Sequence, residues 1–206
     1  GIAGILADHL MVWARDEGGL IVRLLIEDDN LASITHITKV GFTRAASVIR
    51  ATRAIGAASP NPEGNGGRRN PSRLQARPGK RQDLVLVRSV WSTSEAGRLL
   101  RGMIGGHWRF HRLRDIDIED AAASADLWEI GGSWAITDRE EDHWVVRLLA
   151  TDRDEAYDVI RALVDTANNR GAESMEIWLA DSDWTVQAAR RCGFEVSGLG
   201  VWEHPL

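Results

Sequence analysis

The chain has 206 residues, of which 44% are hydrophobic and 27% are charged, and its formal net charge at pH 7 is −5. This length allows one medium domain or two small ones, and the hydrophobic content excludes a wholly disordered chain. No apolar run approaches the roughly 20 residues of a membrane-spanning helix, and no signal segment is evident, so we expect no membrane association. The single cysteine, Cys192, excludes a disulfide scaffold and a cysteine-rich zinc site, and it favours a reducing, cytoplasmic compartment.

The net charge is unevenly distributed along the chain. Acidic and basic residues cancel in residues 1–56, residues 57–82 carry a net charge of +5, and residues 83–206 carry −10. An acidic surface repels phosphate, so the last segment argues against a nucleic-acid partner. It is compatible with a cationic acceptor, although ordinary solubility explains the same charge.

Residues 57–82 have the composition of a linker. Four of the five prolines lie here, together with several glycines and almost no apolar residues. Such a segment cannot form a core, so we predict a basic, Pro/Gly-rich linker over 57–82 that separates residues 1–56 from residues 83–206.

The two regions that flank this linker contain an internal repeat without gaps. Gly19 matches Gly171, Gly41 matches Gly193 and Phe42 matches Phe194, each pair 152 residues apart. Because each of these glycines follows a helical pattern, the repeat predicts two copies of one supersecondary unit in which Phe42 and Phe194 are buried equivalents.

The first copy is predicted to run helix, strand, helix, strand. Apolar residues recur at helical spacing from Ile2, and Gly18-Gly19 ends that helix. Branched residues over 20–26 predict a strand, and Asp28-Asp29-Asn30 offers an N-cap for a second helix. Gly41-Phe42 then turns the chain into another strand.

The second copy is predicted to repeat this order. Its elements are a helix over 156–167, a strand over 175–179, a cap at Asp181 or Ser182, a short helix to Cys192, and a closing strand after Gly193-Phe194.

About 70 residues precede this unit in the second copy only. They predict a strand over 83–92, a helix over 93–103, a short helix over 118–125, and paired strands over 128–137 and 143–150. The chain also begins at Gly1 rather than at methionine, so we expect a fragment whose first copy has lost a segment of similar length.

Residues 1–42 resemble the C-terminal half of a GNAT-superfamily N-acetyltransferase. In that family a strand leads into the loop Q/R-x-x-G-x-G/A, and backbone N–H groups of this loop and of the following helix N-terminus hold the pyrophosphate of acetyl-CoA. Gly1-Ile2-Ala3 fits the G-x-G/A part and Gly4 follows, whereas the Q/R-x-x part lies outside the sequence. The resemblance implies an α/β fold with a GNAT-like mixed sheet flanked by helices, and an acetyl-CoA site that includes Gly1, Ile2, Ala3 and Gly4.

A second motif extends this resemblance. Asn30-x-x-Ser33 followed by Lys39-Val40-Gly41-Phe42 is similar to the N-x-x-S…K-x-G-F pattern of GNAT enzymes. It implies that Asn30 orients the pantetheine arm and that Ser33 is a catalytic and cofactor-binding residue that protonates the leaving thiolate. Many GNAT enzymes place a tyrosine where Ile37 stands. His36 is adjacent, but neighbouring residues on a helix do not share a face. Taken alone, Asn30 is an ordinary N-cap.

The second copy departs from these motifs. In the gapless alignment Arg153 and Glu155 stand where Gly1 and Ala3 stand, and Ser182 and Thr185 replace Asn30 and Ser33. A glutamate adds bulk and repels phosphate, so we predict a degenerate GNAT-like domain over 83–206 without the cofactor loop.

Other candidate residues have simpler explanations. His107-x-x-x-His111 has the spacing of paired helical metal ligands, but Gly105-Gly106 argues against a helix, and we expect no metal. Cys192 is expected to be a small buried residue. Eight of the nine tryptophans lie in residues 83–206 and are expected in the core or at an interface, with an acceptor groove as the alternative. The candidate general bases are Glu129, Asp138, Glu140, Glu141 and Asp142, which the pattern equally predicts to be exposed turn residues.

The resemblance implies transfer of acetyl from acetyl-CoA to an amine on a small molecule or a protein N-terminus. The alternative is a non-catalytic GNAT-like module that binds a ligand or a protein, and a homodimer also stays open. Because the first copy lacks the early strands and the second lacks the loop, we predict a poor acetyltransferase. A hybrid site would require residues 20–26 to pair with a strand of the other copy.

Overall fold

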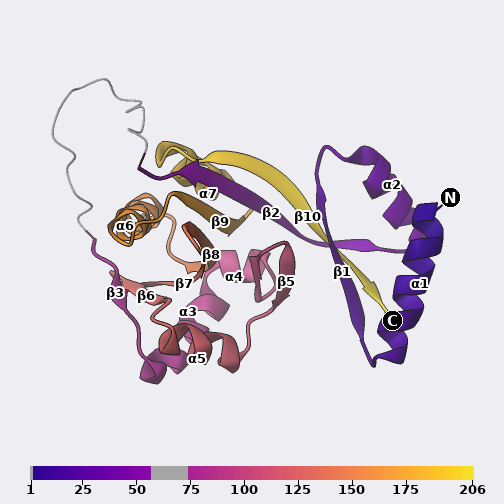
Figure 1. The fold of residues 1–206 in the computed structure, drawn as a ribbon, viewed down its shortest axis with the longest axis horizontal. Coiled ribbons are helices and arrows are strands. Elements are labelled where there is room, and N and C mark those ends of the chain that lie inside the picture. The colour runs from indigo at the N-terminus through magenta and orange to yellow at the C-terminus, as the bar shows by residue number, and fades with distance from the viewer. Residues whose placement is uncertain (1, 57–73) are drawn as a thin grey trace.

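The computed structural model describes residues 2–56 and 74–206, which form two lobes joined by long strands (Figure 1). One eight-stranded sheet runs through both lobes in the order β1-β10-β2-β9-β8-β7-β6-β3, and a separate hairpin contains β4 and β5. Only β8 and β9 pair in parallel, so the sheet is mixed, and helices flank it. The predicted α/β fold class is therefore confirmed. Within the described residues, no helix is long and apolar enough to cross a membrane.

The predicted order of helix, strand, helix and strand is confirmed in both copies. The first copy consists of α1 (Ile2–Asp16), β1 (Ile21–Glu27), α2 (Leu31–Val40) and β2 (Thr43–Ala54). The second copy consists of α6 (Ala156–Asn169), β9 (Ser174–Ala180), α7 (Asp183–Arg191) and β10 (Glu195–Pro205). Phe42 and Phe194 are each 4% exposed, so the prediction that both are buried is also confirmed.

The repeat is not gapless, which corrects the alignment made from the sequence. Gly18 and Gly171 have the same φ of 75° at the ends of α1 and α6, so the equivalent glycines are 153 residues apart rather than 152. From the helix caps Asn30 and Ser182 onward the spacing is 152. The first copy therefore has one extra residue between β1 and α2, and Gly19 corresponds to Ala172 rather than to Gly171.

The final strands of the two copies are exchanged. β10 lies between β1 and β2 of the first copy, while β2 lies between β9 and β10 of the second, and all these pairs are antiparallel. Figure 1 shows β2 and β10 crossing together from one lobe to the other. The pairing across copies that a hybrid site requires is thus present, because residues 21–27 pair with β10.

Three predicted elements before the second copy are wrong in type or extent. Residues 81–93 form a 3₁₀ turn (Arg81–Asp83) and helix α3 (Leu84–Thr93), not a strand; Val87 and Trp91, one helical turn apart, are buried while Val85 is exposed. A short apolar run does not by itself distinguish a buried strand from a helix. The predicted helix over 93–103 is only α4 (Glu95–Leu99), and β4 begins at Met103.

The remaining elements of this region form hairpins and one helix. Residues 128–137 are not one strand but two, because Gly131 and Gly132 have φ of 60° and 93° and form the two-residue turn of a hairpin. The predicted short helix is confirmed as α5. The elements are β4 (Met103–Gly106), β5 (Arg109–Arg112), α5 (Asp115–Ala123), β6 (Leu127–Ile130), β7 (Ser133–Glu140) and β8 (His143–Ala150).

Part of the predicted linker belongs to the folded structure. β3 (Arg77–Pro78) pairs with β6, and Gly79 is buried so close to Leu127 that a Cβ at this position would lie 2.6 Å from its side chain. Residues 57–73 of the predicted linker lie outside the described residues. The division of the chain into domains at residues 56 and 83 stays a prediction.

The cores of the two lobes differ greatly in size. Two large clusters of buried side chains cover the two faces of the sheet in the second copy, one under α6 and α7 and the other under α3, α4, α5 and the β4–β5 hairpin. The lobe with α1 and α2 has a small core with four buried residues, Val22, Ile37, Phe42 and Trp202. The second copy therefore provides most of the rigid framework, and the first lobe depends on a few large side chains.

Candidate functional site

A cavity of about 710 Å³ lies along β1 and α2 in the first lobe. Its lining includes Leu24–Glu27 of β1, Asn30 and Ser33 at the start of α2, and Trp108 from the β4–β5 hairpin of the other copy. Its volume lies in the usual range for ligand sites, about 300–1,000 Å³. The structure therefore brings two of the predicted site residues, Asn30 and Ser33, to one cavity.

The start of α2 leaves polar groups free beside this cavity. Asn30 is the N-cap, and its Oδ1 accepts a hydrogen bond from the Ser33 backbone N–H at 3.1 Å. Neither the side-chain Nδ2–H groups of Asn30 nor the Ser33 hydroxyl has a hydrogen-bond partner among the described residues, whereas the Asn30 backbone N–H donates to the Glu27 carbonyl. The capping interpretation is therefore correct, and it leaves the amide donors and the hydroxyl available to a ligand.

His36 also lines the cavity, although reasoning from the sequence set it aside. It lies one turn after Ser33, so the two residues share a face of α2 at the i, i+3 spacing. Its Nε2 is buried without a hydrogen-bond partner, and the ring lies beside Gly4 of α1. Comparing His36 with Ile37 alone was misleading, because both residues line the cavity; the spacing from Ser33 was the informative signal.

The backbone of β1 contributes further polar groups. Leu206 N–H donates to the Leu20 carbonyl, and Asp28 N–H donates to the Gly198 carbonyl, so the even-numbered residues between them face β10. The N–H and C=O groups of Arg23 and Leu25, and the N–H of Glu27, therefore face the opposite side; the Glu27 carbonyl accepts a hydrogen bond from the Asn30 backbone N–H at 3.0 Å. β1 is the last strand of the sheet within the described residues, so these groups form a free edge.

Trp108 reaches the cavity because a strained turn holds it there. His107 and Trp108 have positive φ values of 50° and 60° in the two-residue turn between β4 and β5. The rings of Trp108 and Trp178 pack in a T-shaped arrangement with their centroids 5.7 Å apart, and the Arg50 guanidinium lies 5.2 Å from the centroid of the Trp108 ring.

Glu176 anchors this contact between the copies. It is 4% exposed, and its carboxylate accepts hydrogen bonds from the Arg50 Nε and the Trp178 Nε1, each at 2.5 Å. The two hydrogen bonds offset the desolvation cost of burying the carboxylate. The cluster therefore holds Trp108 against the first lobe.

The predicted pyrophosphate loop is only partly within the structure. Gly1 lies outside the described residues, and Ile2, Ala3 and Gly4 form the first turn of α1 rather than a loop. Gly4 is close to His36, which places this turn near the cavity. A role for these four residues in holding phosphate stays a prediction.

The second copy has different groups at the equivalent place. The Ser133 hydroxyl lies 3.0 Å from the Thr151 hydroxyl and 3.4 Å from a Glu155 carboxylate oxygen, at the start of α6. In the corrected alignment Ala156 corresponds to Ala3, and Glu155 corresponds to Ile2. The glutamate therefore does not replace the small residue, as the gapless alignment implied, but its carboxylate still lies at the helix N-terminus.

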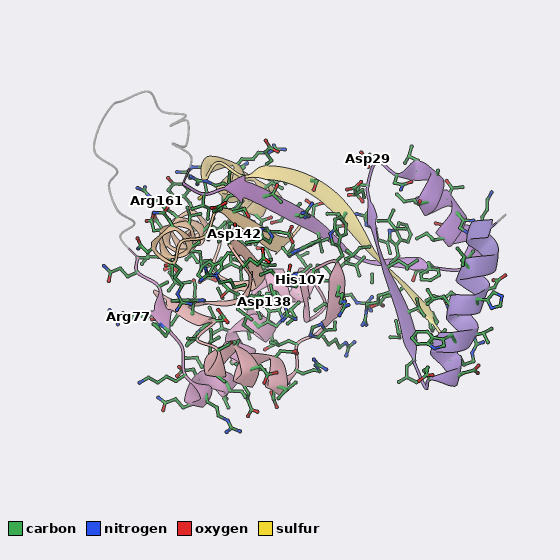
Figure 2. The ribbon with its side chains drawn as sticks, viewed as in Figure 1. Asp29, Arg77, His107, Asp138, Asp142 and Arg161 are labelled. Atoms are coloured by element: carbon green, nitrogen blue, oxygen red, sulfur yellow. The ribbon has the colours of Figure 1, made fainter. Side chains whose placement is uncertain are left out.

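The other candidates are structural or remain unassigned. His107 lies in a hairpin turn, and its ring nitrogens are 3.3 Å from an Asp138 carboxylate oxygen and 3.2 Å from a Glu140 carboxylate oxygen. Figure 2 labels His107 and Asp138 next to each other. His111 contacts Asp117, not His107, and the described residues contain no group of three or more His, Cys, Asp or Glu side chains that could hold a metal. The Glu129 carboxylate accepts from the Gly132 N–H, as expected of a turn residue.

The tryptophans and the cysteine are largely as expected. Seven of the eight tryptophans after residue 82 are buried, at 8% exposure or less, and only Trp108 is exposed, at 48%. Cys192 is buried, and burial raises the pKa of its thiol to about 12, although nearby arginines oppose the shift. A neutral buried thiol is not a nucleophile, which supports the interpretation of Cys192 as a core residue.

Comparison with known proteins identifies the fold. No family model and no curated protein matches the sequence. The chain is similar to a GCN5-related N-acetyltransferase from Sphaerobacter thermophilus, with a TM-score of 0.67 and 11% identity over 100% of this chain and 68% of that one. It is also similar to a GCN5-related N-acetyltransferase from Kribbella flavida (TM-score 0.50, 14% identity, 100% of this chain and 48% of that one). A tandem GNAT protein from the clavulanic acid biosynthesis pathway matches with a TM-score of 0.53 and 10% identity over 100% of this chain and 70% of that one. The mixed sheet, its flanking helices and these likenesses show that the chain has the fold of the GNAT N-acetyltransferases.

Proposed function

We propose that this chain binds acetyl-CoA in the cavity between β1 and α2 and transfers the acetyl group to an amine. The observation that supports the proposal is the cavity itself, which brings Asn30, Ser33 and the free edge of β1 together in a chain with a GNAT fold. The amine belongs to a small molecule or a protein N-terminus. Trp108, from the other copy, then forms part of the acceptor side of the site.

The chemistry requires a nucleophile, a place for negative charge and a proton for the leaving group. The amine nitrogen attacks the thioester carbonyl carbon, the C–S bond breaks, and the proton lost by nitrogen balances the proton gained by the thiolate. The free Ser33 hydroxyl is placed to donate that proton, and the His36 imidazole lies one turn further along the same helix face. The free N–H groups of β1 at Leu25 and Glu27 can stabilise the negative charge that develops on the carbonyl oxygen.

Titration calorimetry with acetyl-CoA tests the binding step. Asn30→Ala is expected to weaken binding by about fivefold, because the side chain loses hydrogen bonding worth roughly 1 kcal/mol. Ser182→Ala is the matched control: it also removes a helix N-cap, at a cost of about 1 kcal/mol in stability, but it lies in the second copy. Equal effects of the two variants on acetyl-CoA affinity would contradict the proposed site.

A thiol-release assay tests acetyl transfer, and chemical-shift mapping tests where CoA binds. Ser33→Ala is expected to lower the transfer rate by about 10²-fold, the usual range for a lost proton donor, and to change the affinity for acetyl-CoA much less. CoA is expected to perturb the amides of residues 24–27 and 30–37. Shifts confined to residues 151–157 would instead place the cofactor at the second copy.

One observation favours the alternative of a non-catalytic module. No described strand lies on the outer side of β1, whereas its equivalent β9 has β8 there. Binding of acetyl-CoA without transfer to any amine would favour this alternative.

A further inference from the structure

A second cavity, of about 180 Å³, adjoins the first. The two cavities share Leu24, Leu25 and Trp108 in their linings, so they are neighbouring parts of one cleft between the lobes. The second cavity adds two cationic side chains, Arg23 and Arg109, to this cleft. The larger cavity has neither of them.

The charges beside the second cavity are unbalanced. Arg23 Nε contacts the Glu203 carboxylate at 2.7 Å, and Arg101 contacts the other oxygen of the same group at 3.7 Å. The Glu203 carboxylate therefore forms ion pairs with two guanidinium groups. The Arg109 backbone pairs with Gly106 in the hairpin, but its side chain is exposed and has no hydrogen bond or ion pair with any residue in the described ranges. Its guanidinium is free to bind an anion.

Trp108 gives this cavity a fixed apolar wall. The side chain is held by Trp178 and Arg50, yet 48% of it is exposed. An aromatic ring that is fixed by its neighbours and still exposed is well suited to pack against the carbon chain of a ligand. Arg109 follows Trp108 directly in the chain, so the apolar wall and the cation come from the same hairpin.

We propose that Arg109 binds a carboxylate or phosphate group of the acceptor, with Arg23 beside it and Trp108 against the connecting carbon chain. The acceptor is then an amine that carries an anionic group at its other end. Guanidinium groups are suited to carboxylate and phosphate because they donate two parallel hydrogen bonds. The overall acidity of residues 83–206 would favour a cationic acceptor. The charged side chains that line this cavity, Arg23 and Arg109, are cationic and favour an anionic group instead. The inference rests on the proposed acetyl transfer.

The test compares ω-amino carboxylates, from glycine to 6-aminohexanoate, with their carboxamides. Binding to the 206-residue chain is measured by ligand-observed NMR without acetyl-CoA, and kcat/KM is measured in the thiol-release assay. Arg109→Gln is expected to weaken binding and to lower kcat/KM for the carboxylates by about 10- to 100-fold, the range for a hydrogen bond to a charged group. The carboxamides are expected to be unaffected. Arg112→Gln is the control, since Arg112 is exposed on the same strand and lies outside both cavities.

Three results would overturn the inference: equal losses for carboxylates and carboxamides, no binding of any carboxylate to the unmodified chain, or a loss of CoA affinity in Arg109→Gln with acceptor binding unchanged. The last result would assign the cation to the phosphates of the cofactor. Carboxylate binding that depends on Arg109 in a chain that does not bind acetyl-CoA would uphold the anion site and contradict the proposed function. The two failures are therefore distinguishable.

Discussion

The Asp117 carboxylate is held by Arg114 and His111. Burial alone would raise its pKa, but hydrogen bonds from the Arg114 side chain and backbone, together with His111, lower that pKa to about 2. The unfolded value is about 3.9. The lowered pKa therefore stabilises the fold fully above pH 4, and this stabilisation is lost as the pH falls from 4 through 2.

Asp117→Asn is expected to lower the free energy of unfolding at pH 7 by about 1–2 kcal/mol and to flatten its pH dependence between 4 and 2. Urea unfolding across this pH range measures both effects. Asp120→Asn is the control, because Asp120 is an exposed residue of the same helix. A steep pH dependence that persists in Asp117→Asn would show that another carboxylate is responsible.

Cys192 supports a second prediction for a single residue. Because burial raises the pKa of its thiol to about 12, the thiol stays neutral at pH 8 in the folded chain. We expect iodoacetamide to leave the native chain unmodified and to label it fully in denaturant, as measured by intact mass. Rapid labelling under native conditions would show that the helix end at Cys192 opens readily.

At the scale of the elements, α1 and α6 are equivalent helices with different surroundings. Leu163 on α6 is fully buried against the sheet, whereas its equivalent on α1, Leu10, is 42% exposed. The same contrast holds for Val159 and Leu6, at 0% and 63%. In the second copy the buried cluster under α6 includes residues of β6, β7 and β8, and no described strands lie in the equivalent place beside α1.

This contrast predicts unequal costs for the same substitution. Leu163→Ala is expected to destabilise the chain by about 2–5 kcal/mol, because it leaves a cavity in the core. Leu10→Ala is expected to cost less than about 1 kcal/mol, as for an exposed position. Chemical denaturation of both variants measures the difference. A large loss for Leu10→Ala would mean that a partner or another copy of the chain covers α1 in solution.

The two phenylalanines that follow the helix ends supply another pair. Phe42→Ala and Phe194→Ala are each expected to cost about 3–5 kcal/mol, the range for a buried phenylalanine. Because the core around Phe42 is small, we expect hydrogen exchange to increase mainly in α1, β1 and α2 in Phe42→Ala. Leu31→Ala, at a position 69% exposed, is the control. A cost below about 1 kcal/mol for Phe194→Ala would contradict its place in the core.

The elements that the sequence predicts well are those with local signals. Helix caps at Asn30 and Ser182, and the glycine ends at Gly41 and Gly193, depend on a few neighbouring residues, and the structure has all of them. The strand predicted over 83–92 is wrong because a short apolar run fits a strand or a helix equally well. The extra residue before Asn30 was hidden because Gly18 and Gly19 are both glycine, and only the backbone angle identifies the equivalent one.

The sequence predicts only the part of the candidate site that lies on α2. Asn30 and Ser33 lie on one helix, and a motif joins them. Trp108 comes from a hairpin more than 70 residues away in the chain, and the exchange of β2 and β10 between the copies, which brings the lobes together, has no local signature. Arg109 was likewise one exposed arginine among many until its position beside the cavity was known.

At the scale of the whole molecule, the exchanged strands make the two copies one structural unit. Arg53 of β2 donates to the Cys192 carbonyl at the end of α7, which adds a cation at the C-terminus of a helix in the other copy. Arg50 and Glu176 form a second link between the same strands. Unfolding either copy would therefore remove strand partners from the other, so the cleft between the lobes depends on both.

The same architecture predicts slow turnover by the 206-residue chain. β9 has a parallel partner in β8, but its equivalent β1 ends the described sheet, so only one side of the cavity has strand donors. Removing one donor from an oxyanion site costs about 10²–10³ in rate, and poor positioning of the amine costs more. We therefore expect acetyl-CoA to bind while turnover stays far below the typical enzyme value of about 10 per second. A thiol-release assay with the amine panel, run at saturating acetyl-CoA as established by calorimetry, measures this. Turnover near that typical value would show that the free edge of β1 and the β4–β5 hairpin already form a complete site.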